Sequence, residues 1–83
     1  MPKVASVTVA FDPDPARLAA QAAALRGEVG DIIVVDNGSA APVSRIPALS
    51  SAHVITLPAN AGLARGFNVG IAAARERGSE LIR

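Results

Sequence analysis

The sequence predicts an α/β fold, a Rossmann-like parallel sheet with flanking helices, in one domain that covers residues 1–83. Strand-like and helix-like segments follow one another in the order strand, helix, strand, strand, helix, strand, an α/β order expected of parallel strands joined by right-handed crossovers. Residues 32–35 form an unbroken apolar run, Ile-Ile-Val-Val. Such a run is typical of a parallel strand covered on both faces, whereas a half-exposed strand alternates apolar and polar residues.

The first expected elements are a strand at residues 4–11 and a helix after it. The strand is rich in β-branched residues and ends at the Asp-Pro-Asp-Pro sequence that follows. Asp14 is placed to cap a helix whose first residue is Pro15, because proline lacks the N–H group that has no partner there. Gly27 is a natural end for this helix. Its apolar face is formed by Leu18, Ala22 and Leu25.

The second strand is expected to begin at Asp31 and end at Asp36. The Asn-Gly-Ser sequence after it has turn chemistry. Residues 40–51 contain two prolines and three serines, which predicts a loop or irregular segment. Residues 54–57 are expected to form a third short strand.

A second helix is expected from about residue 61 to 77, capped by Asn60 and ended by Gly78. Its predicted apolar stripe consists of Leu63, Phe67, Ile71 and Ala74. Residues 80–83 have the character of a fourth strand that has only begun. We therefore expect the chain to be a truncated part of a longer protein.

Composition and charge exclude several classes of function. The net charge of +1 gives no strong field for nucleic acid or a membrane, and two phenylalanines offer no stacking platform for single strands. Without cysteine and with one histidine, the chain has neither disulfides nor a zinc site. No apolar run approaches the roughly 20 residues that span a bilayer. These features predict a cytoplasmic protein without a nucleic-acid partner, in which any attachment to the inner membrane lies in the missing part.

Polar residues follow each of the first three expected strands, at Asp12, at residues 36–39 and at residues 60–62. Ligands of open parallel sheets bind beyond the carboxyl ends of the strands, so these residues form the candidate binding site. Asp36 has two interpretations that spacing alone leaves equally open. Its carboxylate could accept a hydrogen bond from the imide N–H of uracil or thymine, or it could hold its own turn through Gly38 or Ser39.

The most distinctive stretch is residues 60–70, where Gly62, Gly66 and Gly70 interrupt a helix at intervals of four. Three glycines cost about 2–3 kcal/mol relative to alanines, so a close approach to a sheet or a ligand must offset them. The helix N-terminus also suits a diphosphate. Arg65 and Asn68 could share a face near that end, where Arg65 either steadies a phosphate or is simply solvated.

Three segments together resemble family 2 glycosyltransferases, most closely their bacterial rhamnosyltransferase-like branch: residues 7–14, residues 33–39 (Ile-Val-Val-Asp-Asn-Gly-Ser) and residues 60–70 (Asn-x-Gly-x-x-x-Gly-x-Asn-x-Gly). The resemblance covers essentially the whole chain, in the same order. It implies the N-terminal, nucleotide-binding half of a GT-A fold. Asp12 departs from the family, in which asparagine is common at that position.

The resemblance implies a nucleotide-diphospho-sugar donor, dTDP-rhamnose or another dTDP- or UDP-sugar, and transfer of the sugar to a cell-surface polysaccharide or a lipid-linked acceptor. It implies that Ala10, Phe11 and Asp12 frame the base and that Asp36 reads the pyrimidine imide. The residues that border the rest of the nucleotide would be Asn60, Gly62, Arg65 and Asn68. The family's Asp-x-Asp ligands for Mg²⁺ or Mn²⁺, and its catalytic base, lie beyond the end of this chain. The 83 residues alone are therefore expected to be inactive.

Two alternatives come from other classes. A small α/β interaction module, folded by pairing with itself or another chain, would explain the short length. The Asp12-Pro13-Asp14 sequence also resembles the Asp-x-Asp-x-Thr motif of haloacid-dehalogenase-type phosphatases, although Ala16 stands where the threonine is expected. A dinucleotide-binding Rossmann domain is disfavoured because no Gly-x-Gly-x-x-Gly follows the first strand.

Overall fold

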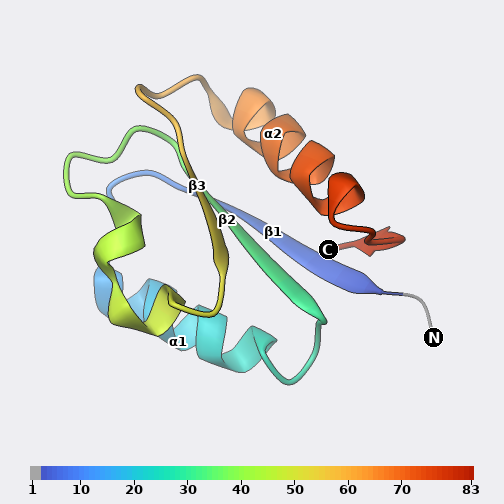
Figure 1. The fold of residues 1–83 in the computed structure, drawn as a ribbon. Coiled ribbons are helices and arrows are strands. Elements are labelled where there is room, and N and C mark those ends of the chain that lie inside the picture. The colour runs from blue at the N-terminus through green and yellow to red at the C-terminus, as the bar shows by residue number, and fades with distance from the viewer. Residues whose placement is uncertain (1–2) are drawn as a thin grey trace.

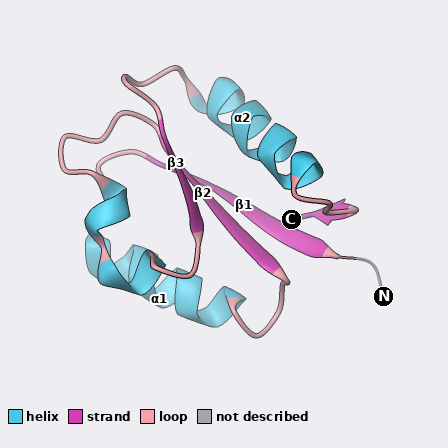
Figure 2. Cartoon of the chain, viewed as in Figure 1, coloured by secondary structure: helices cyan, strands magenta, loops and turns pink. Residues whose placement is uncertain are grey.

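A computed structural model describes residues 3–83 and contains one sheet of four parallel strands between two helical layers (Figure 1). The strand order is β3-β2-β1-β4. The expected parallel α/β sheet with flanking helices is confirmed. The strands are β1 Val4–Ala10, β2 Asp31–Asp36, β3 His53–Thr56 and β4 Leu81–Ile82. The helices are α1 Pro15–Leu25 and α2 Leu63–Glu76, with short 3₁₀ turns η1 Val43–Arg45 and η2 Pro47–Leu49 (Figure 2).

The register of the three longer strands brings their carboxyl ends level. Ala10 at the end of β1 pairs with Asp36 at the end of β2, and Asp36 pairs with Thr56 at the end of β3. The loops after these strands therefore begin side by side at one edge of the sheet.

β2 is buried along its whole length, as its unbroken apolar run predicts. Ile32 and Val34 belong to the core beneath α1, and Ile33 belongs to a second core that includes Ala74 of α2. The central strand thus contributes to the core on each side of the sheet, which explains why alternation is absent from its sequence.

α1 forms as expected. Asp14 is its N-cap, and Asp14 Oδ1 accepts a hydrogen bond from the N–H of Ala16 at 2.9 Å. Leu18 and Ala22 are buried against the sheet.

Residues 40–51, expected to be irregular, form η1 and η2 and complete the core on the α1 side. Val43 and Leu49, at 1% and 3% exposure, are buried in that core. Arg26 fastens this segment to the end of α1, because its side chain donates to Ser51 Oγ at 3.0 Å and to the carbonyl of Ala48.

The second helix differs from expectation in its first residue, its N-cap and its buried face. It begins at Leu63 rather than near residue 61, and its N-cap is Gly62, which makes no side-chain capping bond, rather than Asn60. Its buried face matches the predicted stripe only in part: Ala74 is buried as predicted, whereas Leu63 and Phe67 are 64% and 39% exposed. The buried residues of α2 are Gly66, Gly70 and Ala74.

The reason is the close approach of α2 to the sheet. A Cβ atom on Gly66 would lie 2.8 Å from Val9 Cγ1, and one on Gly70 would lie 3.1 Å from Val35 Cγ2 and closer still to Val7. Valine side chains of β1 and β2 therefore occupy the space that larger helix residues would need. The close-packing interpretation of Gly66 and Gly70 is the one that the structure shows.

At the other end of the sheet, where β2 begins, an ion pair joins the end of α2 to β2. Arg77, directly after α2, donates from Nε to Asp31 Oδ2 at 2.5 Å and from Nη2 to Asp31 Oδ1 at 3.1 Å. Asp31 is 8% exposed, and Lys3 Nζ lies 3.9 Å from its carboxylate. The hydrogen bond from Arg77 lowers the pKa of Asp31 below its ordinary value of 3.8.

No helix in residues 3–83 combines the length and the apolar character that crossing a membrane requires.

Gly70→Ala should destabilise the fold by up to about 2 kcal/mol, since an overpacking penalty of roughly 1–3 kcal/mol is offset in part by a helix-propensity gain of about 1 kcal/mol. Urea unfolding measures the difference. Gly27→Ala is the matched control, because a Cβ there would meet nothing within 4 Å. A Gly70→Ala chain as stable as Gly27→Ala would contradict the close packing of α2.

Acid should weaken the fold through Asp31. A carboxyl group with a lowered folded pKa contributes stability above its unfolded pKa, here 3.8, and loses it as the pH falls through the lower folded value. Urea midpoints measured between pH 6 and pH 2 should therefore fall less steeply below pH 4 for Asp31→Asn than for the unmodified chain. Glu76→Gln, at an exposed carboxyl, should keep the original slope. Equal slopes for all three chains would show that Arg77 does not perturb Asp31.

Candidate functional site

The loops after β1, β2 and β3 are joined at the carboxyl edge by one set of contacts, which we call the strand-end network. Its members are Asp12, Asp36, Asn37, Gly38, Ser39 and Asn60. Four of them, residues 36–39, are consecutive and lie at the end of β2 and directly after it.

Asp36 is buried at 0% exposure and holds the loop after β2. Its Oδ1 accepts from the N–H of Ser39 and its Oδ2 from the N–H of Val43, both at 3.0 Å. The turn-holding interpretation is thus the one that the structure shows. Reading of a pyrimidine imide by Asp36 stays a prediction, and in this conformation its carboxylate has no solvent exposure.

Asn37, 3% exposed, ties the β2 loop to the loop that precedes α2. Its Nδ2 donates to Asn60 Oδ1 at 3.2 Å and to the carbonyl of Gly62 at 3.3 Å. Its Oδ1 accepts from the N–H of Ala61 at 2.9 Å. One amide side chain thereby fixes three consecutive residues through both its donor and its acceptor.

Sequence reasoning placed Asn37 in a turn and in the polar stretch of the candidate binding site, but it missed this role. The signal that could have found it is an amide side chain directly after the last residue of a buried strand, level with a neighbouring loop that also contains an asparagine.

Gly38 brings the backbones of the two loops into direct contact. Its φ of 83° lies in the left-handed region, and a Cβ atom there would fall 2.5 Å from both Ala59 C and Asn60 N. No side chain fits at this position, so the loops can pack this closely only at a glycine.

Ser39 and Asp12 join the β1 loop to the β2 loop. The N–H of Asp12 donates to Ser39 Oγ, and the N–H of Ala40 donates to Asp12 Oδ1, each at 2.9 Å. Asp12 has a φ of 45°, a left-handed conformation that aspartate and asparagine adopt more readily than other residues with side chains. The backbone conformation at this position therefore suits an aspartate or an asparagine.

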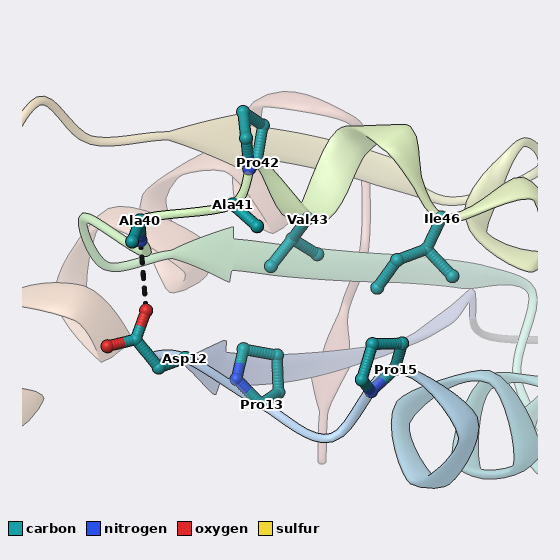
Figure 3. Close-up of a pocket in the computed structure, with 8 residues that line it drawn as sticks. All are labelled: Asp12, Pro13, Pro15, Ala40, Ala41, Pro42, Val43 and Ile46. Carbon is teal, nitrogen blue, oxygen red and sulfur yellow. Dashed lines mark hydrogen bonds between the residues drawn. The ribbon is translucent and has the colours of Figure 1, made fainter.

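A hollow of about 240 Å³ opens beside this junction, between the loops after β1 and β2 (Figure 3). Figure 3 shows Pro13 and Pro15 on one side and Val43 and Ile46 on the other. Asp12 is the ionisable residue of the lining. The complete lining is Asp12, Pro13, Pro15, Ala40, Ala41, Pro42, Val43 and Ile46.

The other expected site residues divide between two regions. Ala10 is buried at the end of β1, and Phe11 after it is 52% exposed.

Asn60 and Arg65 line a second hollow, of about 490 Å³, between the β3 loop and the start of α2. Gly62, with a φ of 89°, caps α2 and donates its N–H to Asn60 Oδ1 at 2.8 Å. Asn68 is exposed on α2 and is not part of that lining.

Residues outside the carboxyl edge have structural positions. Asp14 is occupied as the cap of α1, and His53 begins β3, at the end of the strand opposite to the site. Among residues 3–83, no group of three or more histidine, cysteine, aspartate or glutamate side chains could hold a metal ion.

Comparison with known proteins adds no assignment: no protein-family model, curated protein or solved structure matches the chain. A function for this chain must therefore be inferred from the geometry of the carboxyl edge.

Asn37→Asp should destabilise the chain by about 1–3 kcal/mol, the cost of leaving buried polar groups unpaired. The new oxygen would face two acceptors, Asn60 Oδ1 and the Gly62 carbonyl. Thermal unfolding, together with amide exchange at residues 60–62, measures the effect. Asn68→Asp makes the same chemical change at an exposed position and should be nearly neutral. Equal effects of the two changes would mean that Asn37 does not hold the loop before α2.

Proposed function

We propose that this chain supplies the nucleotide-binding half of a glycosyltransferase that uses a nucleotide-diphospho-sugar, with a dTDP- or UDP-sugar as donor and a glycan or lipid-linked acceptor. The observation that carries the proposal is the strand-end network. It holds three loops at the carboxyl edge of a parallel sheet, the edge at which such sheets bind ligands.

The start of α2 suits the diphosphate of such a donor. Gly66 N–H makes the first helical bond, to Gly62 O at 3.1 Å, so the N–H groups of the residues between them precede the helical ladder. These groups and the positive end of the helix dipole favour an anion. Arg65 is exposed on this first turn and adds a cation. Asn37 fixes the loop that leads into this turn.

Base recognition falls to the end of β1 rather than to Asp36. The ring of Phe11 is 52% exposed and offers a face on which a pyrimidine can stack. Asp12 is exposed and uses Oδ1 for Ala40, which leaves Oδ2 to accept the imide N–H of uracil or thymine.

The chemistry of transfer needs groups that these residues do not provide. A divalent cation, Mg²⁺ or Mn²⁺, would neutralise the departing diphosphate, and the described residues hold no cluster that fits it. The exposed carboxylate near the hollow, Asp12, is a single ligand. We therefore expect residues 1–83 to bind nucleotide without transferring sugar.

A specific observation favours a second candidate, the interaction module. α2 exposes Leu63 and Phe67, and β4 pairs with β1 at Val4 and Ala5, continued by a hydrogen bond from the N–H of Val7 to the carbonyl of Arg83. An apolar helix face beside a partly unpaired strand edge can receive another chain. The phosphatase alternative gains no such support, because Asp14 caps α1.

A chemical-shift titration of the labelled chain with dTDP, UDP, GDP and ADP, with and without Mg²⁺, tests the two candidates. We expect saturable shifts at Phe11, Asp12 and residues 60–65 with the pyrimidine diphosphates alone, unchanged by Mg²⁺. Asp12→Asn should weaken the preference for pyrimidines over purines, since an amide presents both a donor and an acceptor. Arg65→Gln should weaken dTDP and UDP about equally, because it removes a cation near the diphosphate that both share.

Glu76→Gln, at the far end of α2, is the matched control for a lost charge. A well-dispersed spectrum that no nucleotide changes, combined with sedimentation as a dimer, would reject the glycosyltransferase proposal and support the interaction module. Sugar transfer by the purified chain would contradict the expectation that it is inactive alone.

A further inference from the structure

The Asn37–Gly38 pair at the centre of the strand-end network is chemically unusual as well as structurally central. We propose that Asn37 is a site of spontaneous deamidation whose rate is set by opening of the strand-end network, and that the reaction permanently releases the loop before α2. This inference concerns the chain itself and does not depend on the proposed function.

The reaction needs only water as a co-reactant. The backbone nitrogen of Gly38 attacks Cγ of Asn37, the side-chain nitrogen leaves as ammonia, and a five-membered succinimide forms. Water then opens either carbonyl of the ring and gives aspartate or isoaspartate at position 37. Glycine at the next position leaves the attacking nitrogen unhindered, because it has no Cβ.

The fold requires this labile pair at this place. Asn37 uses its donor toward Asn60 and Gly62 and its acceptor toward Ala61, a combination that an amide side chain provides and a carboxylate does not. Gly38 cannot carry a side chain, since a Cβ would lie 2.5 Å from Ala59 C. The contacts that fix the loops therefore keep a reactive dipeptide in the chain.

The same contacts protect Asn37 while they are intact. Its side chain is 3% exposed and is held by three hydrogen bonds. Gly38 is wedged against the backbone of the β3 loop. Ring closure requires the Asn37 amide to leave its partners and turn onto Gly38 nitrogen, so the reaction proceeds from molecules in which the network has opened.

The product cannot restore the network. Aspartate places an oxygen where Nδ2 had donated to Asn60 Oδ1 and the Gly62 carbonyl. Isoaspartate additionally inserts a methylene group into the backbone between β2 and the close contact at Gly38. Each event therefore removes one molecule from the population with an ordered β3–α2 loop.

The test is a time course of deamidation at pH 8 and 37 °C, in buffer and in 8 M urea, followed by peptide mass spectrometry with isoaspartate detection. Asn60–Ala61 and Asn68–Val69 are internal controls, because in each pair the second residue has a side chain. In urea, Asn37 should react faster than both controls. In buffer, Asn37 should react at least about tenfold more slowly than in urea, the factor for an opening free energy of 1.4 kcal/mol.

A second measurement examines the consequence. Chains separated after reaction should show faster amide exchange at residues 60–62 and should match Asn37→Asp in this respect, whereas Asn68→Asp should not change them. Equal deamidation rates for Asn37 in buffer and in urea would contradict control of the reaction by opening of the strand-end network. A rate for Asn37 in urea no higher than that of Asn60 or Asn68 would contradict Asn37 as a preferred deamidation site. Unchanged amide exchange at residues 60–62 in the reacted chains would contradict release of the loop before α2.

Discussion

A carboxylate buried at the end of a central strand must obtain its hydrogen bonds from the protein, and Asp36 obtains them from the loop after β2. Its two oxygens accept backbone N–H groups of Ser39 and Val43, which turns the chain back over the core and places Val43 inside it. Without these bonds a buried acidic group would be strongly unfavourable. The positions of Asn37, Gly38 and Ser39, and thus the joining of the three strand-end loops, depend on this turn.

The glycines of α2 meet a second constraint, the distance between the helix and the sheet. Each glycine in a helix costs about 1 kcal/mol relative to alanine, which close packing must offset. Gly66 and Gly70 rest on Val9 and Val7, where no Cβ atom fits. The helix therefore packs close to the sheet, and its larger apolar residues, Leu63 and Phe67, are exposed to solvent. That placement also brings the first turn of α2 next to the strand-end loops.

These two constraints divide the polar residues of the carboxyl edge. Asp36, Asn37 and Ser39 are used to hold the loops, while Asp12 and Arg65 remain exposed beside hollows. A motif that resembles a ligand-binding signature therefore serves mainly to build the surface on which a ligand would rest. The side-chain amide lets Asn37 hold the loop before α2 through both a donor and an acceptor. Next to Gly38, which no other residue can replace, the same amide also makes the network susceptible to deamidation.

The sequence by itself determined the parallel α/β architecture, the burial of β2 and the capping of α1 by Asp14, because these arise from local patterns of apolar residues and turn chemistry. It also located the candidate site at the carboxyl edge. Only the tertiary structure decided which residues of that edge face solvent. Asp36 was left with two roles, and Asn37 was overlooked, because hydrogen-bond partners 23 to 25 residues away have no local signature. The outward turn of Leu63 was likewise hidden, since helical periodicity cannot tell an apolar face from a glycine face that packs more closely.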